Sequence, residues 1–205
     1  MATAAGIPDT QQSTEQKDLY YRDYYTWARQ QADALRRRDF DAVDWGNITE
    51  EIEALVRGEE SSLRSQYSRI MEHLLKLQYC DPGETYPISG WLRTVHNARG
   101  QVDIVLHHNP GLKGRRDQLC AEAWPFARKN AIDAFVHRTT ERMQNLAALL
   151  REQKRLTREW NRLLPQDNPY TRQQLEAHDW FPDHVRLVQR PQGHQQPATK
   201  IDWDR

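Results

Sequence analysis

The chain has 205 residues, with 29 basic and 29 acidic side chains and a formal net charge of zero at pH 7. This length suits one compact domain with tails, and the 28% share of charged residues favours solvent-facing helices over a sandwich or barrel. No stretch approaches the roughly 20 apolar residues that a membrane-spanning helix needs. Residues 1–60 nevertheless hold 13 acidic and 7 basic side chains, a balance of −6, so residues 61–205 carry +6.

Cysteine usage and the N-terminus indicate where the protein resides. Cys80 and Cys120 lie 40 residues apart without a Cys-x-x-Cys motif, which favours two reduced thiols over a disulfide. The first residues lack a basic segment followed by an apolar one, so no export signal is predicted. We therefore expect a soluble, cytoplasmic protein with no membrane association.

Both ends of the chain lack a regular apolar spacing. Residues 1–17 are small and polar, and residues 187–205 are rich in Gln and Pro, so both are predicted to be disordered tails. Between them, residues 18–186 are predicted to form a single helical domain.

Helical spacing dominates the N-terminal half of this domain. Apolar residues recur at steps of three and four over residues 20–38, and again over residues 48–79. The second run predicts one long helix, bent or weakened at Gly58, rather than a hairpin. Asp44 or Asn47 is well placed to cap its N-terminus.

The C-terminal half continues the helical pattern. Helices are predicted over about 89–108, over 119–135 with Pro125 inside, over about 139–164, and from Tyr170 as a short last helix. No segment alternates apolar and polar residues as a strand does. The predicted fold class is all-α, a compact bundle of about five to six helices.

Several motifs follow one another in a characteristic order. They are Tyr21-x-Asp23-x-Tyr25-x-Trp27, Glu50-Glu51-Ile52-Glu53-x-Leu55, His73-Leu74-Leu75-Lys76-x-Gln78-Tyr79, Trp91 with Arg99, Asn109-Pro110-Gly111-Leu112, Asn168-Pro169-Tyr170-Thr171 and Trp180-Phe181-Pro182. This order resembles the bacterial family called domain of unknown function 29, over roughly residues 20–135 and 164–182. The resemblance implies a small helical protein. Because the family has no assigned activity, it implies no catalytic residues.

Glu51 is the first candidate for chemistry. At 100° per residue it falls between Ile48 and Leu55 on the apolar stripe of its helix, where a carboxylate needs a cation, hydrogen-bond donors or a proton. Arg99, near the inner face of its own helix, is the candidate partner. Two interpretations stay open: a buried Glu–Arg or Glu–Tyr link that fixes helix register, which we favour, and an active site with a perturbed acid.

His73 and Lys76 are the next candidates. A His near basic groups could bind phosphate or act as an acid–base group in RNA cleavage, although a His bordering an apolar stripe is more often a packing residue. A hydrolase using Glu51 with His73 is a weaker option, because 22 residues of continuous helix separate them by about 33 Å. No zinc, di-metal or phosphate-loop motif is present, so neither a metal nor a cofactor is predicted.

A row of basic residues lies on one face of the helix predicted over 139–164. This basic ridge consists of Arg151, Lys154, Arg155, Arg158 and Arg162. It could follow a phosphate backbone, although the solvated face of an amphipathic helix has the same pattern. The favoured hypothesis is a non-catalytic interaction module for a protein partner or a homo-oligomer. The alternative is a nucleic-acid-binding or phosphodiester-acting protein that uses His73, Lys76, Arg99 and the basic ridge.

Overall fold

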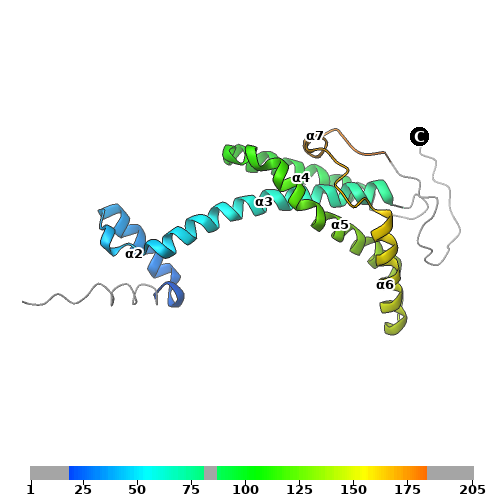
Figure 1. Ribbon diagram of the computed structural model, residues 1–205, viewed down its shortest axis with the longest axis horizontal. Helices are drawn as coiled ribbons and strands as arrows, with labels where there is room; N and C mark the ends of the chain where they lie inside the picture. Colours follow the sequence, from blue (N-terminus) through cyan, green and yellow to red (C-terminus); the bar gives the residue numbers. More distant parts are fainter. Residues whose placement is uncertain (1–18, 81–86, 184–205) are drawn as a thin grey trace, which may run out of the picture. The chain divides into compact units, whose positions relative to one another are not determined.

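The computed structural model describes residues 19–80 and 87–183, and both predicted tails lie outside these residues (Figure 1). Within them the chain is all-α, as predicted, and contains no strand. None of the described helices combines the length and apolar character needed to cross a membrane.

The elements follow the predicted order. They are α2 (Tyr24–Arg37), the 3-10 helix η1 (Phe40–Ala42), α3 (Trp45–Tyr79), α4 (Ile88–His108), the 3-10 helix η2 (Pro110–Arg115), α5 (Arg116–Thr140), α6 (Leu146–Leu163) and α7 (Arg172–Glu176). The structure therefore confirms one long helix, rather than a hairpin, for residues 48–79. The chain divides into two compact units, Met1–Gly58 and Glu59–Arg205.

In the unit Met1–Gly58, α2 has a defined cap at each end. Asp23 interrupts the helical spacing that begins at residue 20, and its Oδ1 accepts a hydrogen bond from the backbone N–H of Thr26 at 3.1 Å. At the other end, Arg38 has a φ of 61°, in the left-handed region. The N–H of Asp39 then bonds to the carbonyl of Ala34 at 2.9 Å, which satisfies an end carbonyl of α2. The chain can thus turn sharply towards α3.

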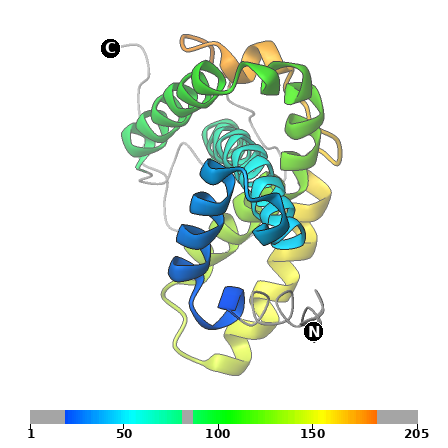
Figure 2. The same cartoon turned by 90° about the vertical axis from the view of Figure 1, so that its left-hand side faces the viewer.

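In the unit Glu59–Arg205, the second half of α3 packs against α4 and α5 (Figures 1 and 2). Along each of these helices, buried apolar residues recur at steps of three and four. They include Leu63, Tyr67, Ile70 and Leu74 on α3, Val95, Ala98 and Val102 on α4, and Leu119, Ala123 and Ala127 on α5. Each large aliphatic side chain in this core contributes about 1.5–3 kcal/mol by burial.

The last long helix begins later than the sequence predicts. Residues 139 and 140 belong to α5, and the Thr140 hydroxyl bonds back to the helix carbonyl four residues earlier at 2.9 Å. Asn145 starts α6 instead, because its side chain accepts the N–H of Ala148 at 2.9 Å. The expected helix 139–164 is therefore corrected to Leu146–Leu163.

Aromatic side chains attach α6 and the C-terminal segment to the core. Phe135 and Trp160 stack with ring centroids 4.2 Å apart, which holds α6 on α5. Tyr170 meets Trp124 edge-on at 6.4 Å, and its hydroxyl donates to Gln78 at 2.8 Å. This segment thereby reaches both α5 and α3.

Neither cysteine forms a disulfide. Cys80 and Cys120 are both reduced thiols, as predicted; both are buried, and both lie in the unit Glu59–Arg205. Burial raises the pKa of the Cys120 thiol to about 12.

Candidate functional site

Glu51 lies in the part of α3 that belongs to Met1–Gly58. Its two carboxylate oxygens accept hydrogen bonds from the hydroxyls of Tyr20, at 2.7 Å, and Tyr24, at 3.1 Å. The bond to Glu51 is the main reason that the pKa of Tyr20 rises to about 12, and it also raises the pKa of Tyr24. Of the interpretations left open, Glu51 forms a Glu–Tyr link, but the carboxylate is half-buried rather than buried, and its bond to Tyr24 is exposed.

Asp44 holds α2 to the start of α3. Its carboxylate accepts hydrogen bonds from the indole N–H of Trp27 at 3.4 Å and from the side-chain amide of Asn47 at 2.7 Å. Its backbone N–H donates to the side chain of Gln31 at 2.7 Å. Asp44 is 8% exposed, so these bonds offset the cost of a buried carboxylate. The sequence predicts Asp44 as a cap but gives no sign of its long-range partners.

Beside this junction, one face of α3 is uncovered. We call it the α3 surface; it consists of Trp45, Ile52, Leu55 and Val56, which are 52%, 58%, 71% and 55% exposed. From its spacing, the stripe of Ile52 and Leu55 is predicted to be an inner face, and the structure corrects that prediction. The residues that contact α2, namely Asp44 and Glu51, lie on the neighbouring face. A helix usually buries its apolar stripe, so an uncovered stripe is a candidate binding surface.

Aromatic residues add to the exposed apolar area of this unit. Tyr21 and Tyr25, before and on α2, are 82% and 70% exposed. Phe40 on η1 is 54% exposed, and its ring centroid lies 6.3 Å from that of Trp45. The indole N–H of Trp45 donates to the carbonyl of Phe40 at 3.2 Å, which fixes the indole beside η1.

Arg99 does not form the predicted pair with Glu51. Its side chain is fully buried and donates to main-chain carbonyls at 2.9–3.0 Å, those of Gln174, Leu175 and Trp180, with a longer contact of 3.5 Å to His178. The guanidinium carbon also lies 5.0 Å from the centroid of the Phe181 ring. Because α7 has only five residues, its last carbonyls lack helical partners, and Arg99 satisfies them. A sequence does not show which backbone carbonyls a side chain will reach. The predicted pairing of Arg99 with Glu51 was therefore wrong.

His73 and Lys76 lie one turn apart on the second half of α3. The Nδ1 of His73 donates to the carbonyl of Arg69 at 2.9 Å, and burial lowers the pKa of this imidazole. Lys76 forms an ion pair with Glu72, whose other oxygen is 3.4 Å from the side-chain amide of Asn130. The predicted candidates Glu51, His73, Lys76 and Arg99 thus each have separate structural partners.

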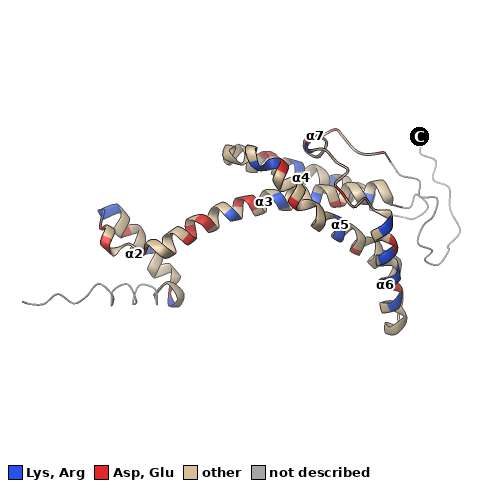
Figure 3. Cartoon of the chain, viewed as in Figure 1, with Lys and Arg blue, Asp and Glu red and all other residues tan. Residues whose placement is uncertain are grey.

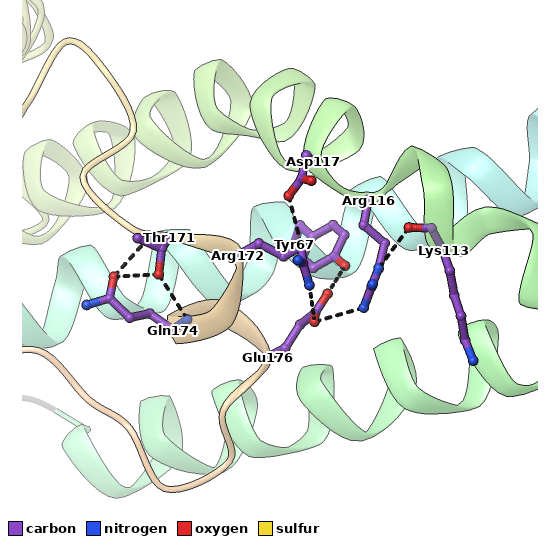
Figure 4. A network of polar contacts seen from close by, with 8 residues as sticks. All are labelled: Tyr67, Lys113, Arg116, Asp117, Thr171, Arg172, Gln174 and Glu176. Carbon is purple, nitrogen blue, oxygen red and sulfur yellow. Dashed lines mark hydrogen bonds and ion pairs between the residues drawn. The ribbon is translucent and has the colours of Figure 1, made fainter.

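A polar network that the sequence does not reveal centres on Glu176 (Figure 4). One carboxylate oxygen accepts from the hydroxyl of Tyr67 at 2.6 Å, and the other accepts from Arg116 at 3.2 Å and Arg172 at 3.1 Å. Arg172 also bonds to Asp117 at 2.7 Å. The network joins α7 to α3 and α5. Burial, and then the bond to Glu176, raise the pKa of Tyr67. No local motif could predict it, because Tyr67 and Glu176 are 109 residues apart.

A protein-family model matches almost all of the described residues. The family model described as "Domain of unknown function DUF29" matches residues 19–181. This chain belongs to the DUF29 family. No curated protein and no solved structure matches it. The match covers the Glu–Tyr link, the α3 surface and Arg99, so all three lie within the DUF29 domain.

Acidic residues lie among the basic residues of α6, which carries the basic ridge of this DUF29 protein (Figure 3). Arg155 is engaged by Glu152 at 2.9 Å and Glu159 at 2.6 Å, and its pKa is raised mainly by the bond to Glu152. The remaining four are exposed, and no ion pair engages them within residues 19–80 and 87–183; they are Arg151, Lys154, Arg158 and Arg162. The same part of the chain contains no group of three or more His, Cys, Asp or Glu that could hold a metal ion.

Proposed function

We propose that this DUF29 protein is a non-enzymatic interaction module that binds another protein through the α3 surface. One observation carries the proposal: four large apolar side chains, each more than half exposed, lie on one face of a helix over three turns. Apolar residues scattered singly over a surface are ordinary, whereas a contiguous apolar face marks a binding site.

The local framework suits a binding role. Asp44 and the Glu–Tyr link fix α2 to the start of α3 through hydrogen bonds of 2.7 to 3.4 Å. A helix that is already held in place loses less conformational entropy when it binds, so more of the contact energy becomes affinity.

The charged candidates support binding over catalysis. Glu51 is held by two tyrosines, Lys76 by Glu72, and Arg99 by main-chain carbonyls. A catalytic acid or base must face the substrate so that it can transfer a proton. These three side chains instead face the protein groups that bind them. We also propose a cytoplasmic location, which the two buried thiols support.

Site-specific cross-linking tests the proposal. A photoreactive residue is placed at Thr49, an exposed residue beside the stripe. In cells of the native host, the protein with an otherwise unchanged α3 surface should form a cross-link to a partner. The double variant Leu55→Ser/Val56→Ser should lose that adduct, and the matched variant Ala54→Ser/Arg57→Ser, on the opposite side of α3, should keep it. If both variants give the wild-type adducts, the α3 surface is not the binding site.

The second candidate function is nucleic-acid binding, and the four exposed cations of the basic ridge favour it. Four phosphate contacts would give a salt slope of at most about 3.6 on logarithmic axes for duplex DNA. A gel shift with RNA and DNA at low and high salt tests this. The absence of any shift at low salt would exclude it, because phosphate contacts are strongest there.

A further inference from the structure

Resting on this proposed function, we infer that the α3 surface binds an amphipathic helix whose apolar stripe is flanked by basic residues. The spacing of the exposed residues, the charges beside them and the composition of the remaining chain support this occupant over the others.

The spacing matches a helix–helix seam. Three residues of the α3 surface, Trp45, Ile52 and Leu55, together with the half-buried Ile48, are separated by steps of three, four and three, which are the a and d steps of a coiled-coil heptad. The ten intervals from Trp45 to Leu55, at 1.5 Å each, make the seam about 15 Å long, enough to align about three turns of a second helix. The next position in this spacing is Glu59, so the apolar seam ends there.

The charges beside the seam are acidic. Glu51 lies next to Leu55 on one side, where two tyrosine hydroxyls bind it, and Glu53 lies next to Val56 on the other, where it forms an exposed ion pair with Arg57 at 3.4 Å. The segment 39–58 contains six acidic residues and one basic residue, a balance of −5 (Figure 3). A helix with Lys or Arg beside its apolar stripe complements both features, as in helix-in-groove recognition.

A second copy of the chain is a poorer occupant. A symmetric pair of α3 surfaces would place the glutamates of one copy beside those of the other, and like charges facing each other across an interface are unfavourable. The basic ridge on α6 could supply charge, but Leu156 and Trp160 of that helix are buried in its own core. Its exposed large apolar residues, Leu146 and Leu150, span a single turn, which is shorter than the seam.

The residues at the two ends of the given sequence, 1–18 and 184–205, are also poor occupants. Residues 1–18 contain three acidic residues and one lysine, so they cannot supply a basic flank. Pro191 and Pro197 divide residues 184–205 into runs of at most eight residues, shorter than the three turns that the seam presents. A separate protein therefore suits the surface better than either of these segments.

Peptide binding to the full-length protein tests this inference. Three fluorescent peptides of about 20 residues share one apolar heptad pattern and carry Lys, Glu or Gln at the flanking positions. Fluorescence anisotropy should show the Lys peptide binding about tenfold more tightly than the Glu peptide, since a few exposed ion pairs together give an effect of that order. Glu53→Lys should reduce the ratio between the affinities of the Lys and Glu peptides about threefold. Leu55→Ser/Val56→Ser should remove binding of every peptide, and Ala54→Ser/Arg57→Ser should not.

The outcomes separate this inference from the proposed function. If the Lys and Glu peptides bind equally and both are lost in Leu55→Ser/Val56→Ser, the surface binds helices but the basic partner is wrong. If no peptide binds, the inference is overturned, and cross-linking in cells still decides the proposed function. A dimer in analytical ultracentrifugation that Leu55→Ser/Val56→Ser dissociates would make a second copy the occupant and would overturn the inference as well.

Discussion

Replacement of Arg99 by Met should strongly destabilise the unit Glu59–Arg205. Met keeps an unbranched side chain in the buried site but cannot donate to the carbonyls of Gln174, Leu175 and Trp180, which lie 2.9–3.0 Å from Arg99 in the native protein. The bond to Leu175 is buried, and the other two are partly buried, so water can restore only some of what is lost.

The expected magnitude follows from these three bonds. A buried carbonyl left without a donor costs about 1–3 kcal/mol, and two of the three can be partly rehydrated, so the total loss should be about 3–5 kcal/mol. Loss of the contact between the guanidinium and the Phe181 ring acts in the same direction. The free energy of unfolding of Arg99→Lys should lie between those of wild type and Arg99→Met. The lysine ammonium keeps the charge, but it cannot donate to several separate carbonyls as the planar guanidinium does.

Urea unfolding followed by far-ultraviolet circular dichroism measures this change. The matched control is Arg93→Met, which alters an exposed arginine six residues earlier on the same helix and should change the free energy of unfolding by less than about 0.5 kcal/mol. In addition, protease should cleave the 176–183 segment faster in Arg99→Met than in wild type. If Arg99→Met were as stable as Arg93→Met, the carbonyl contacts would not hold this segment.

Three further predictions concern titratable groups. Glu51→Ala should lower the melting temperature and return the pKa of Tyr20 from about 12 towards 10, as seen by ultraviolet titration against a Tyr20→Phe reference; an unchanged tyrosine pKa would contradict the Glu–Tyr link. Cys120 should resist alkylation at pH 8 until the protein unfolds, and rapid alkylation of the native thiol would refute this. Because the pKa of Cys120 is raised from 9.0 to about 12 in the folded protein, the contribution of this thiol to stability should be lost as the pH rises from 9 to 12. His73 should titrate below 6.5 by NMR, and its lowered pKa should remove stability as pH falls below 6.5; a pKa at or above 6.5 would contradict its burial.

Most of the fold followed from local patterns. The three- and four-residue steps along residues 48–79 predict a single helix, and α3 is one, because helical periodicity records which side of a helix is apolar. The late start of α6 was missed, since Thr139 and Thr140 can continue α5 through bonds to their own helix, and the cap at Asn145 is a single-residue signal.

The candidate site depended on contacts between distant residues. The sequence alone determined the all-α class, the DUF29 motifs, the apolar stripe of α3 and the two reduced thiols, because each is a property of residue type and spacing. Only the tertiary structure decided that Ile52 and Leu55 are left exposed, that Glu51 binds tyrosines, and that Arg99 binds backbone carbonyls. The physical reason is that periodicity identifies an apolar face without showing what covers it, and a buried charge requires partners without specifying which ones.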